Sequence, residues 1–170
     1  IEQNLGILSN VQGDLDAACS HYLKSLDAFQ SVSDSRGCGM AYHNLGMAYA
    51  DREKWQEAEA FFESSREIAE SLGDDHLQAL CALNQAEVNH ACGAYENAMS
   101  RAQSALRAFE HMGATIDKSD CYRVIGMVYR DTARHVLAEA RFISARALAV
   151  ESGSALSEAE ICRELALLYQ

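Results

Sequence analysis

The stretch AYHNLGMAYADREKWQEAEAFF, residues 41 to 62, places small and large side chains at regular offsets and decides the fold. A Leu-Gly pair is followed three residues later by a tyrosine, and then by Trp55, Ala58 and Phe62. The apolar and small residues recur with i, i+3, i+4 and i+7 spacing, which is typical of one face of an α-helix. A polar break, DREK at 51 to 54, divides the stretch into two predicted helices.

The chain repeats this pattern every 40 residues without an insertion. A register kept over four periods indicates a repeat architecture, because unrelated segments would drift. The aligned columns are Leu5, Leu45, Gln85, Ile125 and Leu165; Gly6, Gly46, Ala86, Gly126 and Ala166; Ala18, Ala58, Ala98 and Ala138; and Tyr22, Phe62, Ala102 and Phe142. Small residues such as Gly46 and Ala58 predict close approach of two helices, with large residues such as Phe62 filling the space beside them.

The ends of the predicted helices also recur. Gly73, in SLGDD, can take the left-handed conformation that ends a helix, and the following aspartate can cap the next one. HMGAT at 111–115 and ESGSA at 151–155 are predicted to do the same, and Ser33 stands at this position in the first unit.

Composition excludes several classes of protein. The 170 residues are 49% hydrophobic, with no proline and ten glycines, which favours helices and a sizeable core. The formal net charge of −11 repels phosphate backbones and anionic lipid surfaces, so we expect neither nucleic acid nor membrane binding. No apolar run approaches the ~20 residues of a membrane span, and no signal peptide is visible. The six cysteines lack zinc-binding spacing, and we interpret them as reduced, mostly buried thiols of a cytoplasmic protein.

These patterns predict an all-α fold. A helix pair cannot bury its apolar face alone, whereas stacked pairs bury a continuous core, so we expect a right-handed α-solenoid of antiparallel helix pairs. The predicted repeats span about residues 1–37, 38–77, 78–117 and 118–157, followed by the first helix of a further unit at 158–170. Residues 1–170 are predicted to form one domain. Because the chain begins inside a helix and without methionine, we expect it to be a piece of a longer protein.

The order Leu-Gly-x-x-Tyr, then alanine nine residues later and an aromatic residue four after that, resembles the tetratricopeptide repeat. Residues 38–76 and 118–156 carry it best, whereas the third unit departs most, with Gln85, Asn89 and Ala102. The period of 40, against the usual ~34, is similar to the subset found in kinesin light chains, Pins/LGN-type adaptors and bacterial regulators. HEAT repeats have a similar length but lack this order of residues.

The resemblance implies a non-catalytic scaffold for protein–protein interaction, in which the first helix of each unit lines a concave groove. On these helices the face opposite the packing face is therefore the candidate peptide-binding site. Its residues are Asn4, Ile7, Met40, His43, Asn44, Met47, Leu83, Asn84, Glu87, His90, Arg123, Met127, Arg130 and Arg163.

Two features of this face have alternative interpretations. Asn4, Asn44 and Asn84 share a column, and their amides could bind a peptide main chain or could serve hydrogen bonds between helices. The three arginines could bind an acidic side chain or a C-terminal carboxylate of a ligand, or could pair with nearby aspartates and glutamates. Methionines in the same face would supply an adaptable apolar floor.

Motifs for nucleotide, dinucleotide or zinc-protease chemistry do not occur, so we predict no catalytic site, no metal and no cofactor. The leading hypothesis is a scaffold that binds an extended segment of a protein partner. A second hypothesis is the sensory or regulatory arm of a larger bacterial signalling or transcription-regulatory protein. A third is self-association into a homo-oligomer through the solenoid ends, since SEAEICRELALLYQ at 157–170 keeps an apolar face that needs cover.

Overall fold

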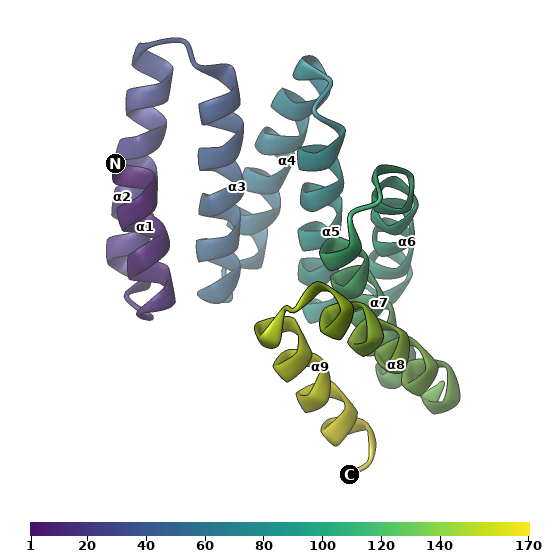
Figure 1. Ribbon diagram of the computed structural model, residues 1–170. Coiled ribbons are helices and arrows are strands. Elements are labelled where there is room, and N and C mark those ends of the chain that lie inside the picture. The colour runs from purple at the N-terminus through teal and green to yellow at the C-terminus, as the bar shows by residue number, and fades with distance from the viewer. The chain divides into compact units, whose positions relative to one another are not determined.

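The computed structural model describes residues 1–170 as nine α-helices joined by short turns (Figure 1). They are α1 (Glu2–Val11), α2 (Leu15–Ser31), α3 (Ser35–Asp51), α4 (Trp55–Leu72), α5 (Asp75–Ala91), α6 (Tyr95–Met112), α7 (Thr115–Asp131), α8 (His135–Ser152) and α9 (Ala155–Leu168). Consecutive helices pack as antiparallel pairs, which confirms the predicted all-α fold. None of the nine combines the length and the apolar character that crossing a membrane requires.

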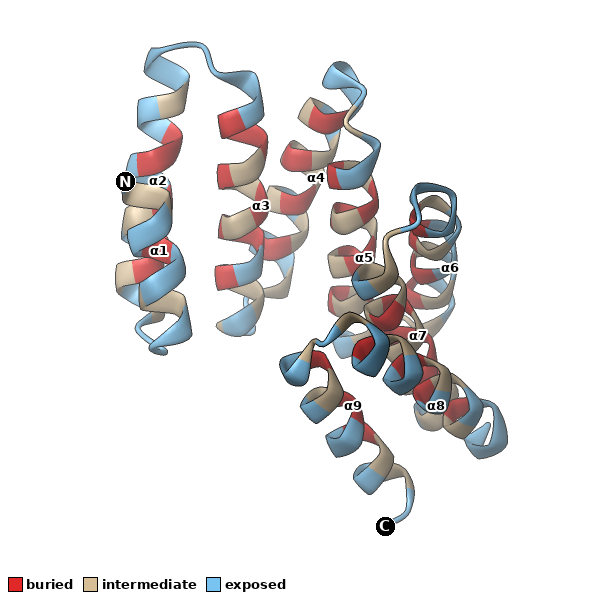
Figure 2. Cartoon of the chain, viewed as in Figure 1, coloured by how far each residue is buried: buried red, intermediate tan, exposed pale blue.

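The chain divides into two compact units, Ile1–Asn84 and Gln85–Gln170, and α5 contributes residues to both. In the first unit α2 packs against α1 and α3, and α3 against α4. In the second unit α7 packs against α6, α8 and α9. Figure 2 shows that buried residues recur along the helices between half-buried and exposed ones, as expected for helices that each turn one stripe towards their neighbours.

An aromatic ring of the second helix lies over a glycine of the first helix in three of the pairs. A Cβ added at Gly46 of α3 would lie 2.6 Å from the Phe62 ring of α4, too close for a real contact. Gly6 with Tyr22, and Gly126 with Phe142, form the same contact. Phe62 and Phe142 are fully buried. The glycine and aromatic columns of the sequence therefore form one contact inside each of these helix pairs.

A buried serine hydroxyl also joins the two helices of a pair. Ser65 Oγ of α4 donates to the Gly39 carbonyl oxygen of α3 (2.8 Å), and Ser119 Oγ of α7 donates to the Ala145 carbonyl oxygen of α8 (2.8 Å). Ser119 lies 80 residues after Gly39 and occupies the equivalent repeat position. The hydroxyl is therefore on the second helix of the α3/α4 pair and on the first helix of the α7/α8 pair, and both pairs keep the hydrogen bond. A buried hydroxyl without a partner would cost stability, which explains why both are bonded.

Each of the eight turns contains one residue with a left-handed backbone, and these residues recur every 20 positions. Five are glycines, at 13, 73, 93, 113 and 153, and three are Ser33, Glu53 and Ala133. Gly73, Gly113 and Gly153 end their helices as predicted. Asp74 and Ser154 accept hydrogen bonds that cap the next helix. The cap predicted in HMGAT is wrong, because Ala114 has no side chain that can accept one.

Four of the six cysteines are buried, and all six are free thiols. Burial raises the pKa of the Cys81 thiol to about 11 and also raises the pKa of Cys121. Both thiols are therefore protonated at neutral pH and serve packing, as the sequence indicates, rather than nucleophilic chemistry.

Replacing Gly46 with alanine should destabilise the protein, although alanine favours helices. Glycine inside a helix costs about 1 kcal/mol relative to alanine, but overpacking a filled core costs about 1–3 kcal/mol. The added methyl group must displace the rigid Phe62 ring, so we expect Gly46→Ala to lower the free energy of unfolding in urea by about 1 kcal/mol. In a Phe62→Leu background this loss should shrink, and an equal loss in both backgrounds would contradict the proposed contact.

Candidate functional site

Side chains 41 residues apart link the first helices of successive repeats. Asn10 Nδ2 of α1 donates to Asp51 Oδ2 of α3 (3.3 Å). Asn84 Nδ2 of α5 lies 2.8 Å from His43 Nε2 of α3. Both pairs lie in the first unit and on the face that carries the candidate residues. Asn84 therefore has the interhelical role that the sequence left as one of two interpretations.

His43 is a buried, neutral imidazole with only 6% of its surface exposed. Because Asn84 donates to Nε2, the ring proton lies on Nδ1. Burial lowers the pKa of His43 to about 4, and the neighbouring Asn44 amide offsets this only in part. The ring centroid lies 5.8 Å from that of Phe62, which places His43 beside the contact that holds α3 and α4 together.

Of two further candidates of the first unit, Leu83 is buried and Met40 is half-buried. Leu83 is 4% exposed, and Met40 packs against the core cluster of Ala69, Leu77 and Cys81. The sequence places them on the groove face, but neighbouring helices cover these positions.

The accessible candidates of the first unit are Asn4, Ile7, Asn44 and Met47, which we call the α1/α3 face. Asn4 is exposed, and Ile7 and Met47 expose 47% and 40% of their surface. Asn44 is half-buried, and its Nδ2 is buried without a hydrogen-bond acceptor. This face thus combines apolar side chains with an unsatisfied amide donor.

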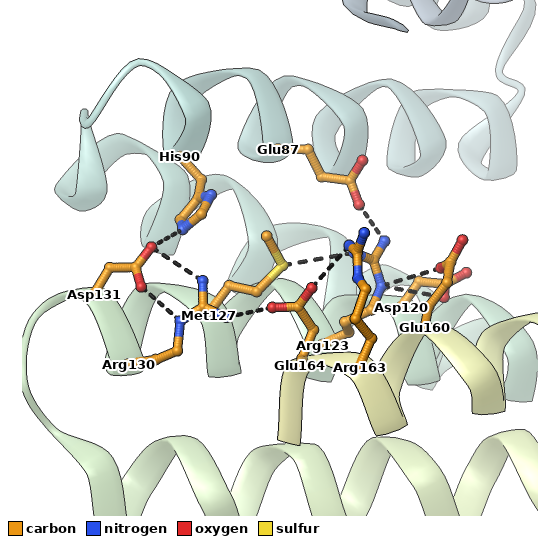
Figure 3. A network of polar contacts seen from close by, with 10 residues as sticks. All are labelled: Glu87, His90, Asp120, Arg123, Met127, Arg130, Asp131, Glu160, Arg163 and Glu164. Carbon is orange, nitrogen blue, oxygen red and sulfur yellow. Dashed lines mark hydrogen bonds and ion pairs between the residues drawn. The ribbon is translucent and has the colours of Figure 1, made fainter. Parts of the chain in front are cut away.

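The second unit carries a network of charged side chains on α5, α7 and α9 (Figure 3). Arg123, whose side chain is only 14% exposed, binds Glu87 and lies 3.6 Å from Glu160 and 4.0 Å from Asp120. Burial by itself would lower the pKa of Arg123, but these three carboxylates outweigh it and raise the pKa. Its Nη1 also lies 3.6 Å from the Met127 sulfur, so a single guanidinium contacts all three helices.

A second guanidinium continues the network. Arg130 pairs with Asp131 (2.7 Å) and with Glu164, and Arg163 Nη2 lies 2.9 Å from the other Glu164 oxygen. Glu164 is 2% exposed, so its carboxylate is buried and paired at both oxygens. His90 Nε2 lies 2.8 Å from Asp131, a further link over 41 positions.

All three arginines of the candidate face therefore have intramolecular partners. The ten residues of Figure 3 include five carboxylates and three guanidinium groups, so the network has a formal net charge of −2. Burial raises the pKa of Asp120 to about 6, although Arg123 opposes this and Glu87 and Glu160 add to it. Of the two interpretations of the arginines, pairing within the chain is the one that the structure contains.

Comparison with known protein families identifies the repeat. Residues 1–71 and 38–111 match the tetratricopeptide repeat. The chain belongs to the tetratricopeptide repeat family. No curated protein matches it in sequence. The resemblance drawn from the Leu-Gly, tyrosine, alanine and aromatic columns is thereby confirmed.

Solved structures share this tetratricopeptide fold at low sequence identity. The apo form of RapI has a TM-score of 0.83 at 15% identity, covering 99% of this chain and 62% of RapI. Aspartyl phosphate phosphatase F from Bacillus subtilis has a TM-score of 0.82 at 12% identity, covering 94% and 42%. A putative kinesin light chain from Podosopora anserina with nearly identical TPR-like repeats has a TM-score of 0.72 at 15% identity, covering 99% and 84%. The chain thus spans less than two thirds of RapI and of the phosphatase, and at these identities the likeness concerns the fold alone.

The hydrogen bonds between first helices were not predicted from the sequence. Equivalent positions of the repeat are 40 residues apart, whereas these bonds join residues that are 41 apart. Neighbouring first helices of these repeats are staggered so that residue i faces residue i+41. Complementary pairs at that spacing are Asn10 with Asp51, His43 with Asn84, and His90 with Asp131. A search for polar pairs 41 residues apart would have found all three.

The His43 ring should titrate at an unusually low pH. Its pKa in the folded protein is about 4, against an ordinary value of 6.5. The stability that the neutral ring contributes is fully present above pH 6.5 and is lost as the pH falls towards 4. We expect NMR titration of the ring protons to place His43 near pH 4. His43→Gln, which can still accept from Asn84, should reduce the loss of stability between pH 6.5 and 4, and an unchanged loss would contradict this assignment.

Neutralising Glu164 should destabilise the second unit. Glu164→Gln removes the charge that Arg130 and Arg163 share, and breaking a buried ion pair costs about 3–5 kcal/mol when the partner is left unpaired. Because Arg130 keeps Asp131, we expect a smaller loss, about 1–3 kcal/mol by urea titration. The matched control is Glu158→Gln in the same helix, whose more exposed pair with Arg146 should contribute less than about 1 kcal/mol. Equal losses for the two variants would show that burial of Glu164 is unimportant.

Proposed function

We propose that this chain is a non-catalytic protein–protein interaction scaffold that binds an extended peptide segment of a partner on the α1/α3 face. Membership of the tetratricopeptide repeat family supports the general role, because these repeats generally serve protein–protein interaction. The α1/α3 face supports the location, since its side chains are accessible while those of the second unit are paired with one another.

The observation that carries the proposal is the contrast between Asn44 and Asn84, which occupy equivalent positions in successive repeats. Asn84 is hydrogen-bonded to His43, whereas the Asn44 Nδ2 has no acceptor. A buried donor without a partner costs about 1–3 kcal/mol. Because Nδ2 is shielded from solvent, the proposal requires the Asn44 side chain to turn outward when a peptide binds. A peptide carbonyl would then accept from Nδ2 and remove that cost, and the amide oxygen could accept from a peptide N–H.

Apolar side chains beside Asn44 would hold a side chain of the same peptide. Ile7 and Met47 share one column of the repeat, and both keep a large part of their surface exposed. Methionine adapts its shape to different partners because it is unbranched and flexible. Main-chain recognition by the amide together with an adaptable apolar surface would select an extended segment rather than one exact sequence.

Charge restricts the composition of this peptide. The chain has a formal net charge of −11, and its groove-face arginines are already paired with carboxylates. An acidic segment would be repelled on approach, so we propose a neutral or basic peptide.

Alanine variants of the two asparagines should separate binding from stability. With peptides selected from a random library against the unmodified chain, we expect Asn44→Ala and Met47→Ala to weaken affinity roughly tenfold. Asn44→Ala should lower the melting temperature less than Asn84→Ala, because it removes the contact of the amide with His43 but also a buried donor without an acceptor, whereas Asn84→Ala removes a hydrogen bond between α3 and α5. Gln56→Ala, on the exposed side of α4, is the control that should change neither. Unchanged peptide affinity in Asn44→Ala would refute the proposed site.

A second candidate function is the sensory or regulatory arm of a larger bacterial signalling or transcription-regulatory protein. The observation that favours it is that two chains of similar fold, RapI and aspartyl phosphate phosphatase F, are longer than the present one. The sequence of the parent gene distinguishes the two functions, since an attached effector domain is required only by the second.

Self-association through α9 is a third candidate. Leu167 and Tyr169 are exposed near its end, although Ile161 is fully buried against α8 and Leu165 packs beside it. Sedimentation that remains monomeric at millimolar concentration would eliminate this candidate.

A further inference from the structure

A surface pocket of about 340 Å³ lies between α6 and α7 of the second unit. Its lining includes Tyr95, Glu96 and Met99 of α6, Tyr129 of α7, and Thr132 and Arg134 of the following turn. The volume falls within the range of ~300–1,000 Å³ typical of ligand pockets. None of the candidate groove residues lines it, so this pocket is a separate feature of the repeat.

The equivalent place in the first unit is filled by an arginine of the chain itself. Eighty residues earlier, Asp16, Cys19, Tyr49 and Arg52 occupy the positions of Glu96, Met99, Tyr129 and Thr132. Arg52 lies 2.8 Å from Asp16 and 3.6 Å from the Cys19 sulfur, and its guanidinium lies 5.8 Å from the centre of the Tyr49 ring. A carboxylate, a sulfur atom and an aromatic ring thus hold one guanidinium group between α2 and α3.

The second cation at this ring is also repeated. Lys54 lies 5.6 Å from the Tyr49 ring centre, and Arg134, its equivalent, lies 6.0 Å from the Tyr129 ring centre. Arg134 therefore takes the place of Lys54 and leaves the place of Arg52 open. The first unit shows that two cations can share one tyrosine in this arrangement.

Between α6 and α7 no arginine stands at the repeat position of Arg52, although groups that could hold a second guanidinium beside Arg134 are present. Thr132 stands at the position of Arg52, but its hydroxyl donates back to the Val128 carbonyl oxygen of α7 (2.7 Å). Glu96 forms no ion pair, unlike Asp16. At the next junction, between α8 and α9, Tyr169 donates to Glu139 across the same place (2.5 Å). Met99, at the position of Glu139, cannot accept such a bond with comparable strength.

We propose that the α6/α7 pocket binds the guanidinium group of an arginine side chain from a partner protein. The planar guanidinium can pair with the Glu96 carboxylate while it lies over the Tyr129 ring, as Arg52 pairs with one oxygen of Asp16 and lies over Tyr49. Met99 occupies the repeat position of Cys19, whose sulfur contacts Arg52. The acidic surface of the chain attracts a cationic partner from a distance. This site is independent of peptide binding on the α1/α3 face.

Capped amino acids test the chemistry directly. N-acetyl-arginine methylamide, added to the full chain, should shift the ¹H–¹⁵N signals of Tyr95, Met99, Tyr129 and Thr132. The capped citrulline, which has the same shape without the charge, should shift them far less. Equal shifts by citrulline, tighter binding of capped lysine than of arginine, or no shifts at tens of millimolar would each overturn the proposal.

Variants then locate the site. Glu96→Gln should weaken binding of capped arginine roughly threefold or more, whereas Glu57→Gln, which removes the same charge from the exposed first turn of α4, should not. Thr132→Arg restores the residue of the first unit, so it should abolish binding and keep the melting temperature at or above that of the unmodified chain. Unaltered binding in both Glu96→Gln and Thr132→Arg would show that the pocket is not the site. Peptide binding on the α1/α3 face should persist in both variants.

Discussion

The contact of an aromatic ring with a glycine backbone sets the geometry of the helix pairs. Phe62 can lie over α3 only because Gly46 has no Cβ, and Phe142 depends on Gly126 in the same way. The third repeat lacks both the glycine and the aromatic residue. There both positions are alanine, Ala86 and Ala102, and both are fully buried. A ring beside an added Cβ would overpack the pair, which agrees with the absence of both the glycine and the aromatic residue from this repeat.

Because the helix pairs are held in this way, equivalent positions recur along the first helices. The polar side chains at these positions differ from one repeat to the next. One column shows the range. Its residue is an amide without an acceptor at Asn44, an amide bonded to His43 at Asn84, and a buried carboxylate shared by two arginines at Glu164. The junction between pairs varies likewise, since it holds Arg52 in the first unit and an open pocket beside Thr132 in the second. The repeated backbone therefore keeps its packing positions alike, whereas the polar groups at equivalent surface positions differ from repeat to repeat.

Local features of the fold could be predicted well, because they depend on residues close in sequence. The polar breaks and the glycine ends at 73, 113 and 153 are where the sequence places them, and α3 begins only three residues before its predicted start at 38. The left-handed residues Glu53 and Ala133 were not predicted, since neither residue type signals that conformation. On the candidate face, the exposure predicted for two residues was wrong. His43 and Leu83 have the spacing of the groove face, but packing of α3 and α5 buries both side chains.

By itself the sequence determined that the chain is built of paired helices, where the pairs end, and which columns pack inside them. It could do so because helical periodicity and a constant repeat length are properties of the chain order. Only the tertiary structure decided which polar groups are satisfied. The partners of His43, His90 and Glu87 lie on neighbouring helices, and the stagger of one residue between first helices, which brings position i beside i+41, arises from packing. For the same reason, Arg123 and Arg130 could be read from the sequence as ligand-binding groups, whereas the folded chain surrounds them with its own carboxylates.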